Sequence, residues 1–391
     1  MDLTRAPEDE AFAREARSWL AENVPRGGLP SGDTAEGFAL HVDWEKKLFA
    51  ARWSVVSWPI ELGGRGASLT QWLLFEEEYH RAGAPQRITQ NGIFLLAPTI
   101  FEFGTEEQKQ RLLPPMAAAK ELWAQGWSEP GAGSDLASVR CKAVRSEAEG
   151  GYRLYGQKAW CTRGAFCDRL FGLFRSDPDS ERHRGLTYLL APLRGEGVTV
   201  RPVARLDGDD GFADVFFDGA FVPDADLLGP PGEGWSIAMA TASSERGLTL
   251  RSPGRFLAAA DRLVALHRSR RGDASAESRD AVVRAWMDAQ AYDLFTHWTV
   301  SQLAPGARMG AEASVMKVFW SELDVRLHES ALSLLGERGE LAPDASEAID
   351  RGAWGTGFQF ALAGPIYAGT NEIQRNVIAE RVLGLPRKAD R

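Results

Sequence analysis

The run YRLYGQKAWC (residues 152–161) is the first of five short segments, rich in β-branched and aromatic residues, that lie between about residues 121 and 232. The others are RLFGLF (169–174), LTYLLAPL (186–193), VTVRPV (198–203) and ADVFFDGAFV (213–222). Gly, Asp and Pro residues separate the five segments, as they separate strands that are joined by turns. The pattern predicts a compact antiparallel β-domain, either a small barrel or a sandwich.

Helical periodicity precedes this β region, from about residue 8 to residue 120. The segment EDEAFAREARSWLAENV (8–24) has apolar residues at helical spacing and ends before Pro25. A second helix is predicted in SLTQWLLFEEEYHRAG (68–83), with Ser68 or Thr70 as its N-cap. A third is predicted in TEEQKQRLLPPM (105–116), capped by its first residue and halted by its two prolines.

Helical periodicity also returns after residue 232, in long amphipathic segments that predict an up-down bundle. The fold class that we predict is therefore α+β, with a helical N-terminal domain (1–120), a central antiparallel β-domain (121–232) and a C-terminal four-helix bundle (233–391).

The composition and charge of the chain argue against several classes of function. The 391 residues carry a formal net charge of −9, and 44% of them are apolar, so we expect a folded enzyme and no nucleic-acid binding. No uncharged apolar run approaches the roughly 20 residues of a membrane span, and the acidic amphipathic N-terminus is unlike a signal peptide, so we expect a cytoplasmic protein. Cys141, Cys161 and Cys167 have neither disulfide nor zinc-ligand spacing, and we expect reduced thiols and no metal site.

Three segments have residues suited to ligand binding. The loop QGWSEPGAGSD (125–135) is rich in glycine, so its backbone N–H groups can approach a polar ligand, although a turn-rich connector fits as well. In GQKAWCTRG (156–164), an indole and a hydroxyl could face a planar heterocycle, or the Trp could belong to the core. In IYAGTNEIQR (366–375), Thr370 or Asn371 can cap a helix whose N–H groups form an anion site, or an ordinary helix start.

In this order, the three segments resemble signatures of the acyl-CoA dehydrogenase family. SWPIELGGRGASL (57–69), FGTEEQKQRLLPPM (103–116) and IYAGTNEIQRNVIAERVLG (366–384) extend the resemblance over nearly the whole chain. The resemblance implies bound FAD, a helical–β–helical domain order and usually a tetramer. It also implies α-proton abstraction by a carboxylate while the β-hydrogen leaves as hydride to flavin N5, which yields a trans-2-enoyl thioester.

The resemblance assigns roles to residues of the loop at 125–135. Ser128 matches the hydroxyl that hydrogen-bonds the pyrimidine edge of the flavin, with the backbone of Trp127 beside it. Gly133 and Ser134 match positions near the flavin and near the pantetheine of the thioester.

The other two segments also match positions around the flavin. Trp160 and Thr162 match the residues that flank the isoalloxazine and hydrogen-bond its N5 region, and Thr370 matches a C-terminal residue near the flavin. The remaining substrate contacts that the resemblance implies are Arg246, Ala368 and Gly369.

The catalytic carboxylate is where the chain departs from most of the family. The family's Glu lies between Tyr and Gly of its IYEGT motif, but this chain has Ala368, of which only the backbone N–H can still polarise the thioester carbonyl. A second branch, which includes isovaleryl- and long-chain-type enzymes, places the Glu before an Arg on the helix after a GxGW turn. Here that helix reads ASSERGLTL, so Glu245 before Arg246 is the predicted base; the alternative is a solvated helix residue.

Two cofactor contacts also depart from the family pattern. The resemblance implies an RxxFG motif whose Arg reaches the flavin pyrophosphate of a neighbouring subunit, but this chain has no clean match to it. Arg268 or Arg271 in HRSRRGD (267–273) could substitute for that Arg. The alternative is that this segment is a charged, solvated helix end. The glycine-rich turn that receives the adenine half reads LLGERG (334–339) here. Such losses resemble the actinobacterial branch that acts on bulky substrates such as steroid side chains, some members of which pair two unlike subunits.

We therefore expect an FAD-dependent acyl-CoA dehydrogenase of lipid β-oxidation that uses Glu245 on a branched or bulky acyl-CoA. The family implies an electron-transfer flavoprotein as acceptor and a homotetramer or a heterotetramer with a related chain. Two alternatives stay open: a dehydrogenase of a carrier-protein-bound acyl group in secondary metabolism, and a non-catalytic partner subunit of a heteromeric enzyme.

Overall fold

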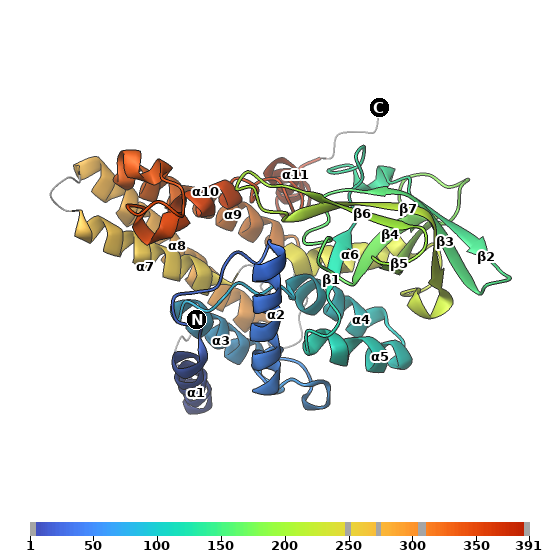
Figure 1. The fold of residues 1–391 in the computed structure, drawn as a ribbon, viewed down its shortest axis with the longest axis horizontal. Coiled ribbons are helices and arrows are strands. Elements are labelled where there is room, and N and C mark those ends of the chain that lie inside the picture. The colour runs from blue at the N-terminus through green and yellow to red at the C-terminus, as the bar shows by residue number, and fades with distance from the viewer. Residues whose placement is uncertain (1–4, 247–251, 271–274, 304–309, 387–391) are drawn as a thin grey trace. The chain divides into compact units, whose positions relative to one another are not determined.

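The computed structural model describes residues 5–246, 252–270, 275–303 and 310–386, and Figure 1 shows its fold. Contacts divide the chain into two compact units. The β unit comprises Leu29–Ala67 and Pro85–Glu245, and the helical unit comprises Met1–Gly28, Ser68–Ala84 and Arg246–Arg391. Each unit takes residues from more than one of the three predicted domains, whose boundaries at 120 and 232 stay a prediction.

The β unit contains a seven-stranded sheet (Figure 1). Its strands are β1 (Trp123–Gly126), β2 (Lys142–Ser146), β3 (Gly151–Lys158), β4 (Arg169–Arg175), β5 (Leu186–Pro192), β6 (Val198–Val203) and β7 (Phe212–Pro223). Neighbouring strands follow the order β1-β4-β2-β3-β7-β6, and β5 pairs with β4. All five predicted runs are strands. The pairing is mostly antiparallel as predicted, but β1 pairs with β4 in parallel.

A β-bulge in β7 determines which face of this long strand is buried. Ala213, Val215 and Phe217 are buried at alternate positions, but the next buried residues are Ala220 and Val222. The shift arises because Tyr155 pairs with Asp218 and Leu154 with Ala220, so the residue between them has no partner. That residue is Gly219, whose φ of +81° suits a bulge. The bulge keeps both halves of β7 on the core of the sheet.

Helices also belong to the β unit. They are α2 (Ala35–Ala50), α4 (Ala97–Phe103), α5 (Glu106–Ala117) and α6 (Gly234–Arg246), with the π-helix η2 (Asn91–Leu96) and the 3-10 turns η1 (Ile60–Leu62), η3 (Leu136–Ser138) and η4 (Asp224–Asp226). We predicted that Pro114 and Pro115 would end α5, but both lie inside the helix. Their carbonyls still accept hydrogen bonds from Ala118 and Lys120, and Leu112, Leu113, Met116 and Ala117 are buried, so packing holds the last turn.

The helical unit is built from both ends of the chain. Its elements are α1 (Pro7–Asn23), α3 (Leu69–Arg81), α7 (Pro253–Ser269), α8 (Ala276–Leu303), α9 (Glu312–Leu335), η5 (Gly336–Glu340), η6 (Ile349–Gly352), α10 (Ala353–Ala361), α11 (Asn371–Val377) and the π-helix η7 (Ile378–Val382). Helices α7, α8 and α9 pack on one another, α10 and α11 pack on α9, and α3 packs on α1, α7 and α8. The predicted C-terminal helical bundle is confirmed, with α3 added to it.

Helix starts agree with the predicted caps. Ser68 caps α3 and Thr105 caps α5, each in a capping box with a Gln three residues later. Thr370 caps α11 and accepts a hydrogen bond from the Ile373 N–H. Among the helices in the described ranges, none combines the length and apolar character needed to cross a membrane.

Candidate functional site

The loop after β1 is held by a tight turn and by its own carboxylate. Glu129 and Ala132 exchange two backbone hydrogen bonds of 3.0 Å, which close the turn over the Pro–Gly pair between them. The buried Glu129 side chain accepts hydrogen bonds from the backbone N–H groups of Arg140 (2.7 Å) and Cys141 (2.9 Å). The carboxylate therefore fixes both ends of the glycine-rich loop, and Ser134 lies on its exposed part.

A buried lysine at the end of β3 joins this loop to the next motif. Lys158 is fully buried, and its Nζ donates to Glu129 Oε1 (2.8 Å), Leu173 O (2.7 Å) and Trp127 O (3.3 Å). Burial alone would raise the pKa of the Glu129 carboxyl, but Lys158 and the backbone donors hold it below its usual value. Sequence reasoning gave neither residue a role, although a lysine and a glutamate among apolar residues were visible there.

Trp160 lies just after β3, whose last residue, Lys158, forms this ion pair. The Ala159 N–H donates to Ser128 O (2.9 Å), and Cys161 exchanges two backbone hydrogen bonds with Ala213. Between them, Trp160 has a left-handed φ of +59°, and 61% of the residue is exposed. Its ring makes an edge contact with Phe212, at 5.7 Å between centroids. An indole so exposed is not a core residue, so of the two interpretations of GQKAWCTRG the ligand-facing one fits.

The surroundings of Trp160 offer polar groups and space. The half-buried hydroxyls of Ser128 and Thr162 have no hydrogen-bond partner among the described residues. A Cβ added to Gly131 or Gly133 would meet nothing within 4 Å, and neither glycine has a positive φ. Neither sterics nor backbone conformation within this chain therefore requires glycine there, which fits a loop that another molecule approaches. We name Trp160 with these two hydroxyls and two glycines the indole ledge.

A second predicted segment forms a turn in the helical unit. Ala368 (φ +57°) and Gly369 (φ +78°) are both left-handed and half-buried. The buried Gln374 side chain donates to both of their carbonyls, at 3.0 and 3.4 Å. Thr370 is the α11 cap, so its hydroxyl is already engaged. This turn therefore has a fixed shape.

Helix α9 anchors the residue that follows the turn. Asn371 is buried, and its Oδ1 accepts from Lys317 Nζ (2.8 Å) and Ser321 Oγ (3.1 Å). The Asn371 N–H donates to Pro365 O (2.8 Å), which closes the segment on itself. Sequence reasoning had considered Asn371 as a cap and had missed Lys317, a buried cation in α9 whose partner is 54 residues away.

Family models match most of the chain in the same order. Residues 6–120 match the model described as "Acyl-CoA dehydrogenase, N-terminal domain", residues 124–220 the middle domain and residues 232–383 the C-terminal domain. The chain belongs to the acyl-CoA dehydrogenase family. The predicted membership and fold class are thereby confirmed.

Relatives within this family are similar over almost the whole length. Acyl-CoA dehydrogenase IpdE1 of Mycobacterium tuberculosis is 40% identical over 391 residues, which cover 97% of this chain and 98% of the relative. The solved structure titled Tcur3481-Tcur3483 steroid ACAD aligns with a TM-score of 0.89 at 25% identity, over 99% of this chain and 100% of that chain. The ChsE4-ChsE5 complex from Mycobacterium tuberculosis aligns with a TM-score of 0.85 at 28% identity, over 99% and 100% of the two chains.

The acyl-CoA dehydrogenase residues that we predicted are divided between the two units. Trp127, Ser128, Gly133, Ser134, Trp160 and Thr162 belong to the β unit, and the loops that carry them meet as described. Ala368, Gly369, Thr370 and Arg268 belong to the helical unit. The backbones of Glu245 and Arg246 form the end of α6, but their side chains lie outside the described residues.

The predicted contacts to the pyrophosphate and adenine of FAD stay predictions. Arg268 is exposed in the last turn of α7, where a cation also suits the helix C-terminus, so both interpretations stay open. Arg271 lies outside the described residues. In η5, which contains most of the segment LLGERG, Glu337 and Arg338 are exposed.

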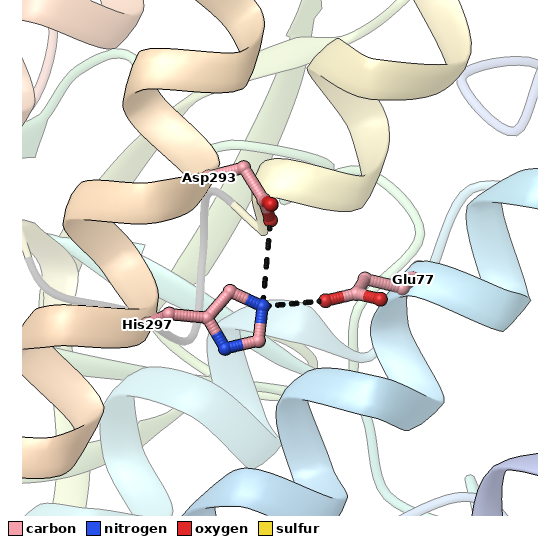
Figure 2. Close-up of side chains that lie close together, drawn as sticks. All are labelled: Glu77, Asp293 and His297. Atoms are coloured by element: carbon pink, nitrogen blue, oxygen red, sulfur yellow. Dashed lines mark hydrogen bonds and ion pairs between the residues drawn. The ribbon is translucent and has the colours of Figure 1, made fainter. Parts of the chain in front are cut away.

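A separate cluster of titratable side chains joins α3 to α8 (Figure 2). His297 Nε2 lies 3.0 Å from Glu77 Oε1 and 3.7 Å from Asp293 Oδ1, and Arg5 pairs with the other oxygen of Glu77 (3.1 Å). The hydrogen bond to Glu77 raises the pKa of His297, and burial raises the pKa of Asp293 to about 6. Their ligand atoms lie within 4.8 Å of one another, a metal-compatible spacing, but a proton on His297 already accounts for the arrangement.

The cysteines of this family member are free and buried. Burial raises the pKa of each thiol, Cys141, Cys161 and Cys167, to about 12. Almost no thiolate forms at neutral pH, so none of them is suited to nucleophilic catalysis. This agrees with the prediction of reduced structural thiols.

Proposed function

We propose that this chain is an FAD-dependent acyl-CoA dehydrogenase, an oxidoreductase acting on CH–CH bonds, that desaturates a bulky acyl-CoA with Glu245 as base. The observation that carries the proposal is the indole ledge: an exposed indole on a left-handed backbone, beside two hydroxyls without described partners. A planar heterocycle of mixed polarity would cover the ring and satisfy the hydroxyls.

In this proposal the β unit holds the isoalloxazine. Ser128 would donate to the pyrimidine edge, Thr162 would donate near N5, and the Trp160 ring would cover one face of the flavin. The bound flavin supplies the hydride acceptor. Glu129 and Lys158 act at a distance, because they hold the two loops that carry these groups together.

The proposed base lies on the last turn of α6, and the turn before it is anchored. Thr241, four residues before Glu245, is fully buried and lies 2.8 Å from Thr99 Oγ1 and 3.3 Å from the Tyr188 hydroxyl. In this proposal the Glu245 carboxylate would remove the α-proton, and the Ala368 N–H would stabilise the enolate oxygen.

The substrate is proposed to be bulky, with a steroid-type acyl group as the first candidate. Two observations support this class: the solved relative whose title names a steroid ACAD, and the alanine at position 368. A methyl group there leaves more room than a glutamate would.

Flavin bleaching tests the proposed reaction. The visible spectrum is recorded for wild type, Glu245→Gln and the control Glu22→Gln, at an exposed carboxylate of α1, before and after addition of steroid-type and straight-chain acyl-CoA thioesters. We expect Gln at 245 to slow bleaching by about 10²–10⁴-fold with flavin still bound, and Gln at 22 to have no effect. Equal bleaching by Glu245→Gln and wild type would refute the assigned base. Turnover of straight-chain thioesters alone would refute the bulky substrate.

A second candidate function is that of a partner subunit in a heteromeric enzyme. Two solved relatives are titled as pairs of chains, Tcur3481-Tcur3483 and ChsE4-ChsE5. The altered turn at η5 would then leave part of the FAD site to the other chain. A colourless chain that binds no FAD alone, but becomes yellow when co-expressed with a related chain, would favour this candidate. For either candidate function, we propose that an electron-transfer flavoprotein is the electron acceptor.

We propose that α8 carries the subunit contact with a second chain of this family. Val283, Met287, Leu294 and Trp298 form an exposed apolar stripe on this helix. The stripe is symmetric about the point between residues 290 and 291, so two antiparallel copies of α8 would pair Val283 with Trp298 and Met287 with Leu294. Related partners with the same stripe would pair similarly.

Light scattering tests this contact. We expect the double substitution of Met287 and Leu294 by Glu to lower the oligomeric state, and a Val144→Glu control, at an exposed valine of β2, to leave it unchanged. An unchanged oligomer in the double variant would refute the assignment.

A further inference from the structure

We propose that Asp33 is a positioning residue, which holds the Trp160–Thr162 segment in the shape that the proposed flavin site requires. The inference rests on the proposed function for its link to flavin, but not for its geometry. Asp33 lies before α2 and is more than 90 positions away in the sequence from the three segments suited to ligand binding.

The segment after β3 has a backbone that needs support from its surroundings. Trp160 and Arg163 have φ values of +59° and +54°, and neither is a glycine. Left-handed conformation is unfavourable for an L-residue with a Cβ. Such conformations persist only where surrounding contacts determine them, and they concentrate at functional sites.

The Asp33 carboxylate supplies such a contact from inside the β unit. Arg163 is buried, and its Nε donates to Asp33 Oδ1 at 2.6 Å. Asp33 is also buried, with an exposed fraction of 3%. Because a charge-assisted bond in a buried place is strong and directional, it fixes Arg163, which directly follows Thr162.

The second oxygen of Asp33 holds the structure on the other side of Trp160. Arg205 Nη1 lies 2.5 Å from Asp33 Oδ2, and Arg205 also pairs with Asp207 (2.6 Å) in the connection between β6 and β7. That connection leads to Phe212, the ring against which Trp160 packs. One carboxylate therefore links the segment that carries the indole to the segment that supports it.

Other contacts join the same elements but do not replace the carboxylate. The Arg163 N–H donates to Gly211 O (3.0 Å), and Phe38 of α2 packs on Phe166 at 5.2 Å between centroids. Without the Asp33 charge, the guanidinium groups of Arg163 and Arg205 would face an uncharged group in a buried place. Each would then seek other acceptors, and the Trp160–Thr162 segment would lose its fixed geometry.

Asp33→Asn tests the proposal, because it keeps the shape of the side chain and removes its charge. The matched control is Glu45→Gln, which removes another buried carboxylate of the β unit, paired with Arg87 at 2.8 Å. Hydrogen exchange of the Cys161 and Arg163 amides is measured without added cofactor. FAD affinity and the visible spectrum of bound flavin are measured by titration.

We expect Asp33→Asn to speed exchange of these two amides about tenfold, to weaken FAD binding about tenfold and to shift the flavin spectrum. Glu45→Gln should do none of these, even where it lowers the melting temperature as much. Unchanged exchange in Asp33→Asn, or equal changes in both variants, overturns the proposal. If exchange responds as expected but wild type binds no FAD, the positioning of the segment stands and the proposed function fails.

Discussion

Lys158→Met is predicted to cost about 3–5 kcal/mol of the free energy of unfolding. The substitution keeps most of the side-chain volume but removes the cation from three buried acceptors: Glu129 Oε1, Trp127 O and Leu173 O. An unpaired neutral carbonyl costs about 1 kcal/mol and an unpaired carboxylate about 2–3 kcal/mol, so two carbonyls and one carboxylate together cost about 4–5 kcal/mol. Glu129 retains its two backbone donors, which limits the loss.

The stability cost of Lys158→Met should also depend on pH, in a direction that the ion pair determines. In wild type the pKa of Glu129 is lowered, so its contribution to stability is present above its unfolded pKa of 4.5 and lost as pH falls through the folded value. In Lys158→Met the same carboxylate is buried without its cation, so protonation of Glu129 removes part of the destabilisation. The penalty is therefore expected to be larger at pH 7 than at pH 4.

Urea denaturation, followed by tryptophan fluorescence at both pH values, measures the penalty. Lys142→Met, at an exposed lysine of β2, is the matched control and should change the free energy of unfolding by less than about 0.5 kcal/mol. The double variant with Glu129→Gln should cost at least about 1 kcal/mol less than the two single costs added. A penalty below about 1 kcal/mol at pH 7, or one independent of pH, would refute the reasoning about this ion pair.

Three further predictions address the ledge, the α3–α8 cluster and the thiols. Gly133→Ala should raise thermal stability slightly, because its Cβ meets nothing and the unfolded chain loses freedom, yet weaken FAD binding in a flavin titration; a loss of stability with normal binding would contradict it. Burial raises the pKa of Asp293 from 3.8 to about 6, so its contribution to stability is present below about pH 4 and lost as pH rises through 6. Asp293→Asn should therefore stabilise the chain at pH 8 by about 1 kcal/mol, after allowance for solvent screening. Urea denaturation measures this change. With pKa values of about 12, the three thiols are about one part in 10⁴ thiolate at pH 8, so a thiol-reactive dye should label them only on unfolding, and rapid labelling of native protein would contradict their burial.

Local features were the most predictable from sequence. The caps Ser68, Thr105 and Thr370 depend on residues within one turn, and the structure has each of them. The prediction that Pro114 ends α5 was wrong, because a proline locally favours the end of a helix, whereas tertiary packing keeps the last turn of α5 helical. The parallel pairing of β1 with β4 joins residues 46 apart, and no periodicity in either strand encodes such a partner.

The residues of the proposed site could be chosen from sequence motifs, but the residues that hold them in place could not. The motifs include Trp160 and the glycine-rich loop, whereas Lys158 and Asp33 act through contacts with residues 29 and 130 positions away. A buried ion pair leaves no pattern in a single sequence, because its partners are neighbours only after folding. The proposed base, Glu245, rests on the resemblance, since its side chain lies outside the described residues.

The ledge is also where the chain departs most from what stability alone would favour. Trp160 combines a left-handed backbone, which costs about 1–2 kcal/mol, with an exposed indole that forgoes much of its burial energy. Gly131 and Gly133 give the unfolded chain extra conformational freedom without any steric need in the folded one. Each departure is unfavourable for the isolated chain and would become favourable if a flat, partly polar molecule covered the indole and filled the space above the glycines. Because all of them lie in two loops that Lys158 joins, the proposed flavin would account for all of them together.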